Sequence, residues 1–200
     1  MDFLGKFIAI EGIDGAGTTT QARLLSEWME KNGYKVYFTK EPTGFLIGQV
    51  IRLALRREVK YDNRVIALLF AADRLHHTEK VILPRLREGV HVVSDRYVMS
   101  SIAYQGALID IDWVRIINRY ALAPTVTLYI DVPVRIAIER MKAKGRRREI
   151  YEIPELLERV RKIYIEECKR NEGKCVIVDG SQPINVVHSN IIRIVQPILK

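Results

Sequence analysis

The residues from Gly12 to Thr19 have the types and spacing of a phosphate-binding loop. They match the template G-x-x-x-x-G-K-[ST] at every fixed position but one, since Thr18 stands where the template has lysine. An apolar run, Phe7 to Ile10, precedes the loop, and helical apolar spacing follows it, so the motif lies between a strand and a helix. The predicted phosphate contacts are Gly12, Ile13, Asp14, Gly15, Ala16, Gly17, Thr18, Thr19 and Thr20.

Phosphate binding by such a loop relies on backbone N–H groups. We expect Gly12, Gly15 and Gly17 to take positive φ angles, while the helix that begins near Thr18 directs its free N–H groups at the anion. Thr19 fills the Ser/Thr position whose hydroxyl binds Mg²⁺. Because Thr18 brings no charge, either any catalysis is slow or another cation substitutes. The alternative is a glycine-rich turn without a ligand.

Acidic residues follow the ends of the apolar runs that we expect to form strands. In a parallel sheet, ligands bind beyond the carboxyl ends of the strands. Carboxylates there suit a Mg²⁺–nucleotide site, although an aspartate after a strand is also a common helix cap or turn former. The residues in question are Glu11, Glu41, Asp95, Asp131 and Asp179.

Short apolar runs alternate with longer helical patterns, which predicts an α/β fold with a parallel, doubly wound sheet. The runs 90–93 and 176–178 are apolar throughout, as strands covered on both faces are. The expected strands are 6–11, 35–40, 90–95, 125–131 and 174–179. The expected helices are 18–32, 47–56, 62–87, 111–122, 134–144, 154–171 and 184–198.

A net charge of +8 and a pI near 9.5 indicate anionic partners. Basic residues are scattered over the predicted helices without interleaved aromatic residues, so we expect small phosphate compounds and no nucleic acid. One composition regime over residues 1–200 predicts one domain. With no signal sequence and no apolar stretch of about 18 residues, we expect a soluble, cytoplasmic protein without a membrane partner.

The cysteines and histidines give no metal-ligand spacing. Cys168 and Cys175 belong to no C-x-x-C pair, so we expect packing residues and neither a disulfide nor a zinc site. We expect the adjacent His76 and His77 to lie on a solvated helix face.

Seven segments occur in a characteristic order and spacing: Gly12 to Gly17, Lys40 to Pro42, Phe70 with Arg74, Asp95 to Tyr97, Ser100, Ala103 to Gly106 and Asp179 to Pro183. Taken together, these segments resemble those of thymidylate kinases, and the resemblance covers essentially the whole chain. The resemblance implies a three-layer P-loop kinase fold, a five-stranded parallel sheet flanked by helices with a short lid at about 143–152. It also implies transfer of the γ-phosphoryl group of ATP to dTMP for dTTP synthesis, with Mg²⁺ as cofactor.

The resemblance assigns individual roles. Thr19 and Asp95 would hold Mg²⁺, and Arg96 would bind the acceptor phosphate and neutralise its charge. From the residues alone, Asp95 and Arg96 are also explained as a local turn with an ion pair. The implied acceptor site comprises Asp14, Glu41, Phe70, Arg74, Arg96, Ser100, Tyr104 and Gln105, and Arg140 and Gln182 join the ATP site.

Phe70 and Arg74 are one helical turn apart, so they share a helix face. By resemblance, Phe70 stacks on the pyrimidine, Arg74 donates to its exocyclic oxygen, and Gln105 contacts its other edge. Tyr104 would close against the sugar and disfavour a 2′-hydroxyl. From the residues alone, Phe70 is equally explained as core, and Asp14 as the start of an Asx turn.

The segment from Gly145 to Tyr151 falls where this family has a lid that closes over ATP. Arg146, Arg147 and Arg148 would supply catalytic charge that the loop lacks, and at least one of them is equally explained as solvated surface. The long apolar helix around 66–86 would form a homodimer interface, although core packing explains the same pattern. Two other functions remain open: a nucleoside monophosphate kinase with relaxed base specificity, and a non-catalytic nucleotide-binding protein.

Overall fold

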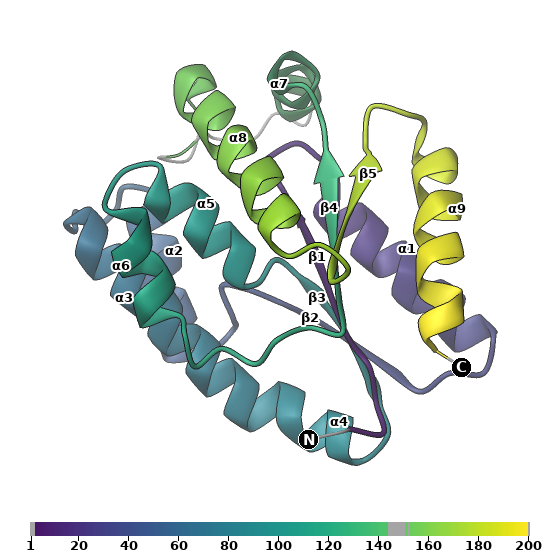
Figure 1. Cartoon of the computed structure of the whole chain (residues 1–200). Coiled ribbons are helices and arrows are strands. Elements are labelled where there is room, and N and C mark those ends of the chain that lie inside the picture. The colour runs from purple at the N-terminus through teal and green to yellow at the C-terminus, as the bar shows by residue number, and fades with distance from the viewer. Residues whose placement is uncertain (1–2, 144–150, 152, 200) are drawn as a thin grey trace.

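Five strands form one parallel sheet in the computed structural model, which describes residues 3–143, 151 and 153–199 (Figure 1). The strands are β1 (Phe7–Gly12), β2 (Val36–Lys40), β3 (His91–Asp95), β4 (Val126–Asp131) and β5 (Cys175–Asp179), in the order β2-β3-β1-β4-β5. The three central strands are almost wholly buried, because helices cover both faces of the sheet. The predicted α/β class and five-stranded parallel sheet are confirmed.

Helices form the two outer layers (Figure 1). On one side of the sheet lie α1 (Thr18–Lys31) and α9 (Ile184–Val195), and on the other lie α5 (Val98–Gly106) and α8 (Pro154–Arg170), with α2 (Leu46–Leu55), α3 (Asn63–His77) and α6 (Ile111–Ile117) beyond them. The remaining elements are a π-helical turn (Thr78–Ile82), α4 (Leu83–Arg87), α7 (Val134–Ala143) and a 3₁₀ turn (Gln196–Ile198). None of the helices in the described ranges is long and apolar enough to cross a membrane.

Most predicted elements occur within a residue or two of their expected bounds, with four differences. Helix α5 was not predicted, the expected helix 62–87 contains the π-helical turn, α6 ends five residues early, and α9 ends three residues early, where the 3₁₀ turn begins. The expectation that 176–178 is covered on both faces is wrong, because β5 is an edge strand and Ile177 is 44% exposed.

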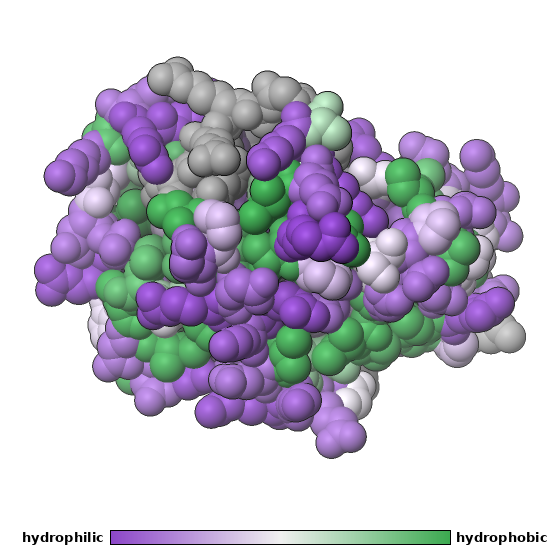
Figure 2. Space-filling model, turned by 90° about the horizontal axis from the view of Figure 1, so that it is seen from above, coloured by the Kyte–Doolittle hydropathy of each residue, from purple (hydrophilic) through white to green (hydrophobic). Residues whose placement is uncertain are grey.

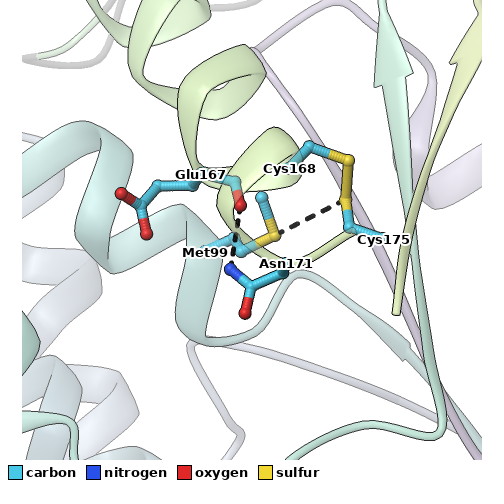
Figure 3. Close-up of a disulfide and its surroundings, with 5 residues drawn as sticks. All are labelled: Met99, Glu167, Cys168, Asn171 and Cys175. Carbon is cyan, nitrogen blue, oxygen red and sulfur yellow. Dashed lines mark hydrogen bonds between the residues drawn. A yellow bond between two sulfur atoms is a disulfide. The ribbon is translucent and has the colours of Figure 1, made fainter. Parts of the chain in front are cut away.

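The two cysteines form a disulfide, which corrects the expectation of unpaired packing residues. Cys168 lies in the last turn of α8 and Cys175 begins β5, with their Cα atoms 5.1 Å apart (Figure 3). Only a short turn separates the two elements, so a helix end and a strand start meet across a sequence separation of 7. The pairing depends on this turn geometry, which the cysteine spacing alone does not reveal.

The expectation of a solvated histidine pair is also wrong for one member. His76 is half-buried, whereas His77 is 1% exposed and contacts Thr39 and Glu41. Successive helical residues point about 100° apart, so one histidine faces the interior while its neighbour stays near the surface.

Candidate active site

The phosphate-binding loop joins β1 to α1 at the carboxyl edge of the sheet, where polar side chains dominate the surface seen from above (Figure 2). Gly15 and Gly17 have φ angles of 86° and 96°, as expected. Gly12 does not take a positive φ, which corrects that expectation. A Cβ on Gly12 would instead lie 3.0 Å from Ala16 Cβ and from the carbonyl oxygen of Ile130, so a larger residue here would be tightly packed.

The first turn of α1 is the electropositive feature of the loop. Its N-cap, Gly17, gives no side-chain cap, so the N–H groups of this 14-residue helix face the loop without a side-chain acceptor among the described residues. Thr18 begins the helix and is 6% exposed. Its Cγ2 methyl lies 3.0 Å from the position of a Cβ on Gly12, so this side chain packs inside the loop.

Thr19 and Asp95, the predicted Mg²⁺ ligands, are in direct contact. Thr19 Oγ1 donates to Asp95 Oδ2 at 2.5 Å, while Asp95 Oδ1 is buried without a hydrogen-bond partner in the described part of the chain. An oxygen pair of this kind fits a hard cation. The described residues hold no cluster of three or more His, Cys, Asp or Glu suited to a metal ion.

Arg96 follows β3 and lies against the phosphate loop. Its φ of 69° is a left-handed value that is rare for a residue with a side chain. The guanidinium donates to the Gly12 carbonyl oxygen at 2.7 Å and to Asp14 Oδ1 at 2.6 Å. Burial alone would lower the pKa of Arg96, but Tyr104 and Asp14 raise it well above its ordinary value, so the group is cationic.

Tyr104 binds the same aspartate. Its hydroxyl donates to Asp14 Oδ2 at 2.9 Å and accepts from the Asp14 backbone N–H at 2.8 Å. Burial and then the Asp14 charge raise the pKa of Tyr104 well above its ordinary value, so the phenol stays protonated. The structure thus brings Asp14, Arg96 and Tyr104 together beside the loop.

A cavity of about 260 Å³ opens on the Arg96 side of the loop. All but one of the predicted acceptor-site residues line it, and Phe70 both lines the cavity and packs on the core. Its lining comprises Asp14, Lys40, Glu41, Pro42, Arg52, Leu55, Phe70, Asp95, Arg96, Ser100, Ser101, Tyr104, Gln105 and Tyr151. Arg52, Ser101 and Tyr151 were not predicted; Arg52 has no motif to mark it, and it donates to the Pro42 carbonyl oxygen at 3.0 Å.

A second cavity, of about 530 Å³, adjoins the other side of the loop. Gly15, Gly17 and Thr20 of the loop line it together with the predicted Arg140 and Gln182. Arg140 donates to the Gly180 carbonyl oxygen at 2.9 Å, which ties α7 to the turn after β5. Residues of this one glycine-rich loop therefore line both cavities.

Comparison with known proteins identifies the family. The thymidylate kinase family model matches residues 10–191. The chain is 42% identical to a probable thymidylate kinase of Pyrococcus horikoshii over 198 residues, which is 96% of each chain. It is 42% identical to a probable thymidylate kinase of Pyrobaculum calidifontis over 191 residues, 95% of each, and 39% identical to a thymidylate kinase of Thermosipho africanus, over 95% of this chain and 97% of that one.

The chain belongs to the thymidylate kinase family. The resemblance found in its motifs is confirmed, and the chain is a phosphotransferase by family. The expected lid arginines Arg146, Arg147 and Arg148 lie outside the described residues.

Arg74 is the predicted acceptor-site residue that does not line the first cavity. It is 1% exposed, and its guanidinium donates to Asn118 Oδ1, to the Tyr97 carbonyl oxygen and to Ser101 Oγ at 2.5, 3.1 and 3.1 Å. It also pairs with Glu41 at 2.7 Å. Arg74 therefore lies behind the wall of the first cavity and contacts two residues that line it, Glu41 and Ser101.

Glu11 was singled out in the sequence only as one of the strand-end carboxylates, without a role of its own. This buried carboxylate of β1 accepts from the backbone N–H groups of Tyr97 and Ser100, at 3.0 and 3.2 Å, and from Ser100 Oγ. It thereby caps the N-terminus of α5 and fixes the residue after Arg96. Burial raises the pKa of Glu11, opposed by the Ser100 hydrogen bond and the Arg96 charge. Its only sequence signal was a carboxylate ending a fully apolar strand.

Proposed function

We propose that this chain transfers the γ-phosphoryl group of ATP to dTMP, giving ADP and dTDP, with Mg²⁺ as cofactor. The observation that carries this proposal is the pair of cavities on either side of one phosphate-binding loop. A donor nucleoside and an acceptor nucleotide need separate sites whose phosphates meet at a common point. The family, and the names of the relatives, support dTMP as the acceptor.

On the donor side, the cavity beside Arg140 and Gln182 takes the adenosine, and the triphosphate runs into the loop. Backbone N–H groups of the loop and of the first turn of α1 bind its oxygens. Mg²⁺, held by Thr19 and Asp95, would neutralise phosphate charge when bound. The unpartnered Asp95 Oδ1 supports this assignment.

On the acceptor side, Phe70 offers an apolar ring to the base. The Gln105 Oε1 atom is buried without a hydrogen-bond partner in the described part of the chain, so it suits a ring N–H donor such as that of thymine. Gln105 Nε2 contacts the Tyr151 hydroxyl at 3.5 Å. Tyr104 lies close to the loop, where the sugar of a bound nucleotide would pass.

Phosphoryl transfer depends mainly on positioning and charge. An oxygen of the dTMP phosphate attacks the γ-phosphorus, and the bond from this phosphorus to the β–γ bridging oxygen breaks, leaving its electron pair on ADP. Arg96 contacts the loop at Gly12 and lines the acceptor cavity, so its charge reduces repulsion between the two anions. Arg146, Arg147 and Arg148 supply further charge in this proposal, which for them rests on sequence alone.

A coupled assay of ADP release with ATP and Mg²⁺ tests the function. The proposal predicts the highest kcat/KM with dTMP among dTMP, dUMP, dCMP, dGMP and UMP, and dTDP as the product. Similar rates with all five monophosphates would instead support relaxed base specificity. ATP binding without any ADP release would support a non-catalytic nucleotide-binding protein.

We further infer a homodimer and a cytoplasmic location. Exposed apolar side chains at helical spacing on α3, namely Val65, Leu68 and Leu75, support a protein contact there. The location follows from the proposed substrates, which are intracellular nucleotides.

A further inference from the structure

A chain of buried polar side chains lies behind the acceptor cavity. Thr39 Oγ1 contacts His77 Nε2 at 2.7 Å, and His77 Nδ1 contacts Glu41 Oε1 at 3.0 Å. The other carboxylate oxygen of Glu41 pairs with Arg74 Nη2 at 2.7 Å. The side chains of Glu41, Arg74 and His77 are at most 2% exposed. A buried ion pair of this kind requires fixed geometry, because each unpaired polar atom carries a large desolvation cost.

Helix α3 holds the segment after β2 through neighbouring side chains. His77 and Arg74 bind Glu41, while Asp73 accepts from the backbone N–H and the hydroxyl of Thr43 at 2.8 and 2.5 Å. The held segment contains the cis peptide bond Glu41–Pro42. Both flanks of this wall segment are therefore fixed by one helix.

The same segment forms part of the acceptor cavity. Glu41, Pro42 and Ser101 line it, and Ser101 Oγ accepts from Arg74 at 3.1 Å. Glu41 is the charged partner of this guanidinium, which also donates hydrogen bonds to Asn118 and to the Tyr97 carbonyl oxygen. Arg74 Nε is buried without a partner among the described residues, so the guanidinium has an unused donor directly behind the wall.

The chemistry of the groups determines which atom donates in each hydrogen bond between Thr39, His77 and Glu41. An ionised carboxylate only accepts, so His77 Nδ1 must donate to Glu41. In a neutral imidazole, Nε2 then accepts from the Thr39 hydroxyl. We propose that His77 is a positioning residue of the acceptor site, which fixes Glu41 and, through it, Arg74 and the cavity wall. This inference rests on the proposed function.

Two substitutions separate positioning from space filling. The amide nitrogen of His77→Asn lies near the position of Nδ1, so this variant retains a donor to Glu41 and loses the Thr39 contact. The amide of His77→Gln lies near the position of Nε2, so this variant retains the Thr39 contact and loses the donor to Glu41. Thr39→Val is the matched control for losing the hydroxyl alone.

We expect His77→Gln to raise KM for dTMP about tenfold or more, since a hydrogen bond to a charged group is lost. KM for ATP should stay within about twofold, and His77→Asn and Thr39→Val should raise KM for dTMP by less than about threefold. Melting temperatures of all variants show whether each is folded. Equal KM values for dTMP in the Asn and Gln variants would overturn the proposal.

Turnover of dTMP by the wild-type enzyme is the control for the function itself. If the wild-type enzyme does not turn over dTMP, the proposed function is wrong. The tautomer of His77 is tested independently of activity by ¹⁵N NMR of the imidazole in the wild-type protein. We expect Nδ1 to carry a proton. A neutral imidazole protonated only at Nε2 would overturn the positioning role, whatever the enzyme phosphorylates.

Discussion

Thr18 occupies the position at which the phosphate-loop template has its lysine. Its methyl group packs against Gly12, and the loop's backbone N–H groups do not depend on it. We therefore expect Thr18→Lys to leave kcat/KM unchanged or to raise it, because an ammonium group would supply the charge that the template lysine provides.

Arg146, Arg147 and Arg148, the proposed lid arginines, provide the matched comparison for Thr18. If they compensate for the missing lysine, replacing one of Arg146, Arg147 or Arg148 by alanine lowers kcat at least tenfold, and less so in the Thr18→Lys background. Steady-state kinetics of single and double variants measure this. A large loss of activity in Thr18→Lys itself would mean that the threonine has a role of its own.

His91 in β3 gives stability a pH dependence. Burial and then Lys6 lower the pKa of His91 below 6.5, and its Nδ1 accepts from the Lys6 backbone N–H at 3.0 Å. The unfolded chain therefore binds the proton first as the pH falls. The stability contributed by His91 is fully present above about pH 6.5 and is lost as the pH falls through the lowered pKa.

The variant His91→Asn places an oxygen acceptor near the position of Nδ1 without a titrating group. Between pH 7.5 and 5.5, we expect the melting temperature of the wild type to fall further than that of the variant. Partial solvent contact limits the difference to on the order of 1 °C. If the melting temperatures of the wild type and the variant fell by the same amount between the two pH values, this account would be contradicted.

Residue types predicted the local chemistry better than they predicted the long-range contacts. The roles of Thr19 and Asp95 were predicted from a motif and a strand end, and the structure brings these side chains together. Glu11 was given no individual role and His77 was expected on a solvated face, because their partners lie 86 to 89 and 36 to 38 positions away along the chain. No local pattern encodes such contacts.

At the scale of elements, α5 is the informative omission. It has only 9 residues, two of them serine, and its N-cap, Tyr97, gives no side-chain cap. Glu11 of β1 supplies the missing cap from outside the helix. Helices of this length are marginal without tertiary contacts, so intrinsic propensity did not reveal an element that presents Ser100, Tyr104 and Gln105 to the cavity.

The disulfide joins two elements and makes its own prediction. It closes a short loop between α8 and β5, so Cys168→Ser with Cys175→Ser should lower the free energy of unfolding by about 2 kcal/mol. For a chain of this size the melting temperature should fall by about 4–8 °C. Beside the disulfide, Asn171 Nδ2 donates to the Glu167 carbonyl oxygen at 2.8 Å, and Cys175 Sγ lies 4.0 Å from Met99 Sδ of α5 (Figure 3).

Calorimetry with and without a thiol reductant provides the control for the disulfide. Reductant should lower the melting temperature of the wild type and leave that of the double variant unchanged. Equal melting temperatures of oxidised wild type and double variant would show that the bond contributes nothing to stability.

At the scale of the whole molecule, strand and helix alternation was sufficient to predict the sheet, because each parallel crossover requires a helix. Strand order and edge exposure were not predicted from the pattern. Ile177 shows why: an apolar run looks the same whether its second face is covered by a helix or partly open to solvent.

The proposed homodimer is also a property of the whole molecule. Leu68 on α3 is 48% exposed, and burying a charge there would oppose association, so Leu68→Asp should convert the dimer to a monomer. Leu4, which is 78% exposed and precedes β1 in the sequence, provides the control substitution Leu4→Asp. Light scattering should give twice the chain mass of 23.1 kDa for the wild type and for Leu4→Asp. A monomeric wild type would contradict the proposal.

The measurement that tests the account most directly is a calorimetric titration of the protein with ATP and Mg²⁺. The central claim under test is that backbone amides of the loop bind the triphosphate without a lysine. We predict saturable binding of one ATP per chain, and severe weakening in Gly15→Ala, whose Cβ would lie 2.3 Å from the Ala137 carbonyl oxygen at a φ of 86°. A wild-type protein that fails to bind ATP with Mg²⁺ present would contradict the account.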